Sequence, residues 1–113
     1  VAKAERLAEA ACRYESSARL FKQAAAAGRR AHSTASERGA MQALAETWTK
    51  LGYVRSLLPK EAGDVGWTFA AYVNSMRLHM QLGQPKELLL VLVDVARWSL
   101  AQGDADKAQQ ALA

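Results

Sequence analysis

Two turn signals stand 20 residues apart in the last third of this chain and limit how that part can fold. The first is Leu-Gly-Gln-Pro at 82–85, and the second is Ala-Gln-Gly-Asp at 101–104. Glycine commonly ends a helix and proline commonly begins the next one. Each signal therefore predicts a bend between paired helices, and helix pairs that stack in series form extended binding surfaces.

The composition favours an all-α protein. Half of the 113 residues are apolar and 23% are charged, which excludes a disordered or fibrous chain. Alanine is abundant and there are only two prolines, which favours helix. The length suits one domain, so we expect a single α-helical repeat domain over residues 1–113. The longest uncharged stretch, between Asp64 and Arg77, is too short to span a bilayer, and we expect no transmembrane segment.

The positive charge is concentrated in the first half of the chain. The net charge is +4, and residues 1–60 hold 11 Lys or Arg against 5 Asp or Glu, whereas residues 61–113 hold 4 against 6. The basic end could face an acidic protein, an RNA backbone or lipid headgroups, although solvated helix faces explain most such imbalances.

The single cysteine, Cys12, cannot form an internal disulfide and is expected to be a small buried thiol. This favours an intracellular, reducing compartment, either the cytoplasm or an organelle interior. A chain that begins at Val1 also fits a processed N-terminus, a fragment or a disordered start.

Apolar residues at helical spacing predict five helices, at about residues 2–27, 34–58, 64–82, 85–102 and 104–113. Gly28 is predicted to end the first helix as a left-handed cap. Thr34 and Glu37 form a capping box for the second, Pro59 ends it, and Asp64 caps the third. Whether residues 52–63 form a regular helix is left open.

The apolar stripes are predicted to form the core. In the first three helices they comprise Leu7, Ala11, Tyr14, Ala18, Phe21 and Ala25, then Met41, Leu44, Trp48 and Leu51, then Val65, Phe69, Tyr72, Val73, Met76 and Met80. Residues 88–93 are apolar without a break, so the fourth helix is expected to be the most buried. A buried strand is the competing interpretation, but no second strand candidate exists to pair with it.

Several segments carry repeat-like patterns. Gly-Asp-Ala-Asp-Lys-Ala at 103–108, followed by Leu112, resembles the turn and second helix of a tetratricopeptide (TPR) unit. Arg-Tyr-Glu-Ser-Ser-Ala at 13–18, followed by Phe21, resembles the same second helix. The spacing of the two glycine turns is more similar to the longer hairpins of SNAP-like helical repeats. Within that group, residues 77–85 resemble a segment of the family of the forty-kilodalton huntingtin-associated protein.

This resemblance covers residues 2–28 and 64–113. It implies a right-handed stack of antiparallel helical hairpins that binds a partner and has no activity of its own. Residues 52–59 depart from it, because they lack the small residue that the second helix of a repeat needs at its closest contact.

No catalytic or metal-binding pattern is evident in the sequence. Cys12, His32 and His79 do not come within ligand or charge-relay spacing, and no glycine-rich phosphate loop follows a strand. We therefore expect no enzyme activity, no metal and no cofactor. His79 is expected to be a packed histidine with one hydrogen bond, and His32 to face solvent.

The partner-binding candidates include one tryptophan. Trp67 has few obvious internal neighbours, although packing on its own domain is the alternative, whereas Trp48 and Trp98 are expected in the core. The other candidates are Arg6, Arg13, Arg29, Arg30 and Leu112.

The predicted function is a non-catalytic protein–protein interaction module, or an accessory or scaffold subunit of a larger assembly. In this interpretation the basic first helix steers an acidic partner and the unfinished last helix leaves an open end. The alternative is RNA or anionic-surface binding through the basic N-terminal half.

Overall fold

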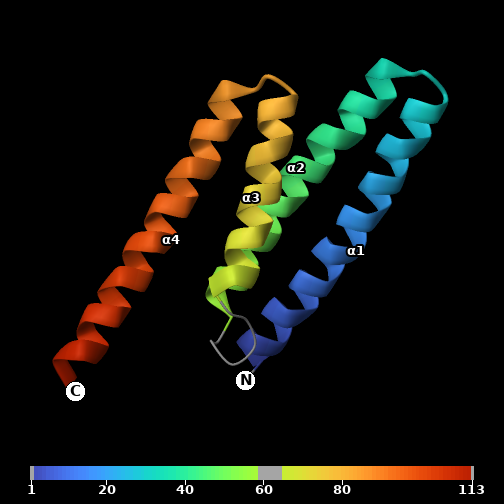
Figure 1. Ribbon diagram of the computed structural model, residues 1–113. Helices are drawn as coiled ribbons and strands as arrows, with labels where there is room; N and C mark the ends of the chain where they lie inside the picture. The colour runs from blue at the N-terminus through green and yellow to red at the C-terminus, as the bar shows by residue number, and fades with distance from the viewer. Residues whose placement is uncertain (1, 59–64, 113) are drawn as a thin grey trace.

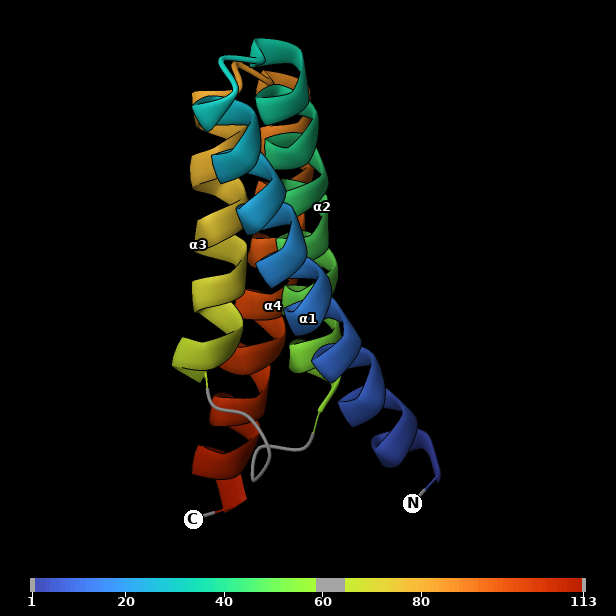
Figure 2. The ribbon, with the colours of Figure 1, turned by 90° about the vertical axis from the view of Figure 1, so that its right-hand side faces the viewer.

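The computed structural model describes residues 2–58 and 65–112, with the side chains of residues 2–58 and 66–103. The described residues form four α-helices: α1 (Ala2–Arg30), α2 (Thr34–Leu57), α3 (Val65–Gln81) and α4 (Pro85–Leu112). Successive helices run antiparallel, with α1 and α4 at opposite edges of the array (Figure 1). The molecule measures 58 × 31 × 17 Å, and Figure 2 shows its narrower profile. The prediction of an all-α fold is confirmed over this part of the chain.

The second turn signal does not produce a bend, and residues 85–112 form one helix. At the first signal, Gly83 adopts a left-handed φ of 66° and Pro85 then begins α4. Gly103 has no positive φ and no proline after it. A glycine inside a helix costs only about 1 kcal/mol relative to alanine, which favourable neighbours offset. The prediction of five helices was therefore wrong, because only the first signal contains a proline.

The connection between α1 and α2 differs from the prediction at Gly28. The helix continues through it to Arg30, and the left-handed residue is His32, with a φ of 57°. Gly28 is buried because α2 begins directly against it: a Cβ atom there would lie 2.8 Å from the backbone nitrogen of Glu37. The glycine is thus needed for a close approach of two helices, and not for a left-handed backbone.

The N-cap of α2 is Ser33, so the predicted capping box was wrong. The Ser33 Oγ atom accepts a hydrogen bond from the backbone N–H of Ser36 at 3.4 Å. Thr34 is already the first residue of the helix, and the Glu37 carboxylate pairs with Arg29 instead. Pro59 and Asp64, the predicted end of one helix and cap of the next, lie outside the described residues.

The contact between α1 and α2 follows the predicted stripes. The buried members are Ala11, Ala18, Ala25, Leu44 and Leu51. Alanine on the α1 side lets the two backbones approach closely, and the half-buried Leu7, Tyr14 and Trp48 pack around the core cluster. Trp48 therefore belongs to the core region, as predicted.

The buried face of α3 contains Tyr72 of the predicted stripe, as expected, but is otherwise made of small or polar residues. Thr68, Ala71, Tyr72, Ser75 and His79 are buried. Ser75 Oγ donates a hydrogen bond to the backbone carbonyl of Ala45 in α2 at 2.8 Å, which satisfies a buried hydroxyl. The large side chains of Phe69 and Met80 are 44% and 66% exposed, so they were wrongly assigned to the core.

The three residues with possible metal or redox chemistry, Cys12, His32 and His79, do not form a metal-binding group among the described residues. His79 is 3% exposed and its Nδ1 atom lies 2.9 Å from Gln84 Oε1, which confirms a packed, hydrogen-bonded histidine. His32 is exposed in the connection after α1. Cys12 is exposed, and the prediction of a buried thiol was wrong. Its neighbour Ala11 faces α2, so the next residue along the helix points away from that contact.

Candidate functional site

The helix α4 carries apolar residues on two opposite faces. Its inner face packs on α3 through Val91, which is 3% exposed, and through Trp98, whose ring stacks on Phe69 at a centroid distance of 6.0 Å. Its outer face carries residues spaced at steps of four, three and four, which place them on one side of a helix. We call this set the outer stripe: Leu89, Val93, Ala96 and Leu100.

The outer stripe is open to solvent. Leu89 is 63% exposed, Val93 46% and Leu100 68%. The prediction that residues 88–93 are the most buried segment was therefore wrong, and so was the alternative of a strand. The physical reason is position: α4 lies at the edge of the array, packs mainly on α3, and leans away from the other helices toward its C-terminal end (Figure 1). A helix at an edge buries one face, whatever the composition of the other.

Two cations border the outer stripe on the same side. Lys86 precedes Leu89 by three residues and Arg97 precedes Leu100 by three, so both lie on the same flank of α4. Both are exposed, and neither has a carboxylate partner within the described part of the chain. The outer stripe is thus an apolar strip with positive charge along one border.

A groove of about 280 Å³ lies between α2 and α4, with His79 of α3 among its walls. Its lining is Glu46, Thr49, Lys50, His79, Glu87, Leu90, Val91 and Asp94. Three carboxylates against one lysine make this groove acidic. It contrasts in charge with the flank that carries Lys86 and Arg97.

Arg55, near the C-terminal end of α2, contacts residues of two other helices and so connects three helices. Its guanidinium donates to Glu15 of α1 at 3.2 Å and to the backbone carbonyl of Trp67 in α3 at 3.0 Å. It also lies 4.0 Å from the centroid of the Trp67 ring, within cation–π range. Burial lowers the pKa of Arg55, while the nearby Glu15 carboxylate acts in the opposite direction. The Arg55 side chain is 9% exposed, and its buried Nε atom has no hydrogen-bond partner among the described residues.

A second groove, of about 300 Å³, lies between α1 and α2, and Arg55 forms part of its wall. It is lined by Glu15, Ala18, Arg19, Lys22, Trp48 and Arg55. Three cations against one carboxylate make it basic, and Trp48 supplies an aromatic wall. This groove is the place in the basic half of the chain where an anion would find several donors together.

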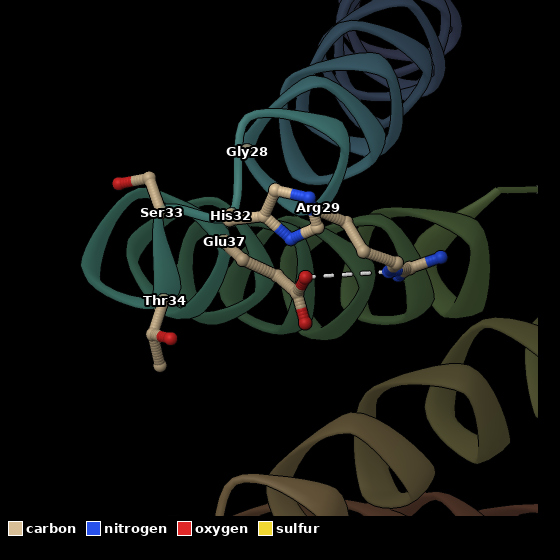
Figure 3. Close-up of a pocket in the computed structure, with 6 residues that line it drawn as sticks. All are labelled: Gly28, Arg29, His32, Ser33, Thr34 and Glu37. Atoms are coloured by element: carbon tan, nitrogen blue, oxygen red, sulfur yellow. Dashed lines mark hydrogen bonds and ion pairs between the residues drawn. The ribbon is translucent and has the colours of Figure 1, made fainter.

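A third hollow, of about 230 Å³, lies at the turn between α1 and α2. Figure 3 shows Arg29 and Glu37 pointing toward one another beside His32, while Ser33 and Thr34 point away. The Arg29 Nε atom donates to Glu37 Oε2 at 3.2 Å, so the charge of Arg29 is partly neutralised within the fold. The ion pair between Arg29 and Glu37 connects α1 and α2 at their turn.

The predicted partner-binding residues do not converge on one surface. Arg6, Arg13 and Arg30 are exposed along α1, and Arg13 pairs with Glu9 at 2.7 Å. Trp67 is half-buried against Arg55, and Leu112 is the last residue of α4, with its side chain outside the described set. The ring of Trp67 therefore contacts Arg55 of its own domain, and its role in partner binding remains a prediction.

Two kinds of feature are absent from the described residues. No three His, Cys, Asp or Glu side chains there lie close enough together to hold a metal ion. None of the helices over residues 2–58 and 65–112 is long and apolar enough to cross a membrane.

Comparison with known proteins adds no assignment. No family model, curated protein or solved structure matches this chain. The resemblance to helical repeats remains a prediction from the sequence.

The outer stripe was missed at the level of sequence, although a signal for it was present. The unbroken apolar run at 88–93 places apolar residues on every side of a helix. Such a helix is either surrounded by its own fold or has one face left for something else. The run alone does not distinguish these cases, because the distinction depends on how many helices pack around it.

Proposed function

We propose that this chain is a non-catalytic protein–protein interaction module, an accessory or scaffold subunit of a larger assembly. The observation that supports the proposal is the outer stripe of α4. Contiguous exposed apolar surface on a small protein commonly marks an interaction site. Protein interfaces typically combine an apolar centre with a polar rim, and the outer stripe with its flanking cations has this composition.

The energy available from covering the outer stripe is sufficient for a moderate interaction. Leu89, Val93 and Leu100 are each about half to two-thirds exposed. Complete burial of such a side chain contributes roughly 1.5–3 kcal/mol, so covering the three would contribute on the order of 3–5 kcal/mol. Association has its own entropic cost, so additional contacts around the stripe are needed for tight binding.

The finer architecture is part of the proposal. Antiparallel neighbours in series, from α1 through α4, are compatible with hairpins of a TPR or SNAP-like right-handed stack. In such an array a helix at the edge has a face that no other described helix covers, and α4 lies at an edge. An exposed single thiol at Cys12 is compatible with a reducing intracellular compartment.

The test is affinity purification from the native source with the full chain as bait. We expect a defined protein that stays bound after nuclease treatment and at moderate salt. The double substitution Leu89→Gln and Leu100→Gln should remove it, because it makes the centre of the outer stripe polar. Both side chains are largely exposed, so the free energy of unfolding should change by less than about 0.5 kcal/mol for each substitution.

A matched control lies on α1. Leu20 is 64% exposed, close to the values for Leu89 and Leu100, and Leu20→Gln should leave the partner bound. If Leu20→Gln and the α4 double variant behave alike, the outer stripe is not the binding surface. If no protein is recovered, the interaction proposal itself fails.

A second candidate function is anion binding in the basic groove between α1 and α2. Arg19, Lys22 and Arg55 supply its positive charge, and Trp48 offers a surface for stacking. RNA or an anionic membrane surface would then bind with a steep dependence on salt. Recovery of nucleic acid that Arg19→Glu with Lys22→Glu abolishes would favour this function over the protein-binding one.

A further inference from the structure

We infer that the partner segment covering the outer stripe is an amphipathic helix with acidic residues along one flank. The inference depends on the proposed function and specifies the chemistry of the partner. It combines three features of α4: the regular spacing of the outer stripe, the small residue at its centre, and the unpaired cations on one side.

The spacing favours a helix as the occupant. Steps of four, three and four residues are those of the apolar seam between two packed helices. Leu89 and Leu100 are separated by about 16 Å along the helix axis, from the rise of 1.5 Å per residue, which is about three turns. Ala96 between them leaves room for a side chain of the partner to enter. An amphipathic helix binds such a strip through its own apolar stripe.

The charges favour an acidic flank on the partner. Lys86 and Arg97 stand on one border of the outer stripe, exposed and without a carboxylate partner among the described side chains. A partner helix with Glu or Asp at the facing positions would pair with both. Lys or Arg at the same positions would be repelled, and repulsion is an effective source of specificity.

The same charges argue against a second copy of this chain as the occupant. In an antiparallel pair of α4 helices, a two-fold axis brings like flank to like flank, so the flank that carries Lys86 and Arg97 would face the same cationic flank of the other copy. In a parallel pair that flank would face the opposite border, whose described side chains include Leu92 and Ser99 and no carboxylate. Among the side chains described over residues 86–103, neither arrangement places a carboxylate against the two cations.

The experiment uses the full chain and two labelled synthetic peptides. Both peptides are amphipathic helices with leucine and alanine along one stripe; one carries glutamate along a flank and the other carries lysine at the same positions. Fluorescence anisotropy is measured below the concentration at which the peptides self-associate. We expect the glutamate peptide to bind about three- to tenfold more tightly than the lysine peptide, from two exposed ion pairs. The difference should shrink as salt is added.

Charge reversal on the protein provides the decisive comparison. The double variant Lys86→Glu with Arg97→Glu should reverse the preference, so that the lysine peptide binds more tightly. The control variant Lys3→Glu with Arg77→Glu reverses the charge of two exposed cations on α1 and α3 and should leave the preference unchanged.

Four outcomes would overturn the inference. They are equal affinity for the two peptides, preference for the lysine peptide by the unmodified chain, binding of neither peptide, and loss of the preference in the control variant of Lys3 and Arg77. Displacement of the glutamate peptide by single-stranded RNA that itself requires Lys86 and Arg97 would also overturn it, in favour of a nucleic-acid site. Loss of a copurified partner in the Leu89→Gln and Leu100→Gln variant, together with equal peptide affinities, would retain the proposed function and reject only the acidic flank.

Discussion

Replacing two glycines of α2 by alanine should have different effects on stability. Gly52 faces the ring of Tyr72: a Cβ atom at position 52 would lie 2.9 Å from two of the ring carbons. Tyr72 is only 1% exposed, so its ring has little room to move away. Gly39 lies in the same helix, and a Cβ there would meet nothing within 4 Å. Both substitutions therefore replace glycine by alanine in the same helix, and only the one at Gly52 creates a close contact.

The expected magnitudes follow from two contributions. Alanine is favoured over glycine inside a helix by about 1 kcal/mol, and this gain applies at both positions. Overpacking against a fixed neighbour costs about 1–3 kcal/mol, and this cost applies only at Gly52. We expect Gly39→Ala to raise the free energy of unfolding by up to about 1 kcal/mol. Gly52→Ala should be less stable than Gly39→Ala by about 1–3 kcal/mol.

The measurement is thermal and urea denaturation followed by far-ultraviolet circular dichroism. A difference of 1 kcal/mol corresponds to a shift in Tm of about 4 °C for a domain of this size. Equal stability of Gly52→Ala and Gly39→Ala would refute the close packing of Tyr72 on α2. Adding Tyr72→Leu to Gly52→Ala should relieve the clash, and failure to do so would point to another cause.

Three other properties follow from single buried or exposed groups. Arg55→Ala should lower the free energy of unfolding by about 2–4 kcal/mol, measured by urea denaturation, because it removes the contacts that join three helices. Arg55→Met should stay within about 1 kcal/mol of the original, since losing the buried charge also removes its desolvation cost; a methionine variant as unstable as the alanine one would contradict this. Burial, with a smaller effect from the charge of Asp94, raises the pKa of Tyr72 to about 12. In the unfolded chain the pKa of tyrosine is about 10, so the free energy of unfolding should be constant below about pH 10 and fall as the pH rises toward 12. A Tyr72→Phe variant with an unchanged alkaline slope would be evidence against this. Cys12 is exposed, so one equivalent of a thiol reagent should react with the folded protein nearly as fast as in denaturant, and slow reaction would show that the thiol is covered.

The sequence was a good guide where a signal acts within one or two turns of helix. The stripes of α1 and α2 were predicted correctly, because the repeat of apolar residues follows directly from helix geometry. The prediction of a bend at 82–85 was also correct, because glycine and proline there restrict the backbone directly. The bend predicted at Gly103 failed because a glycine without a proline only permits a turn.

The candidate site was harder to predict from the sequence than the helices were. The arginines chosen for their charge lie along α1, and two of them, Arg13 and Arg29, are partly neutralised by Glu9 and Glu37. The contact between Arg55 and Trp67 joins residues of different helices, and nothing in their local sequence marks it.

The sequence by itself determined that this chain is helical and where most of its helices begin, because those properties depend on residues within a few positions of each other. Only the tertiary structure decided which faces are covered. The apolar run at 88–93 would be a buried core helix if other helices surrounded it. At the edge of the array it packs on one side, and the outer stripe remains exposed. Burial depends on how many neighbours a helix has in space, and that number is a property of the whole fold.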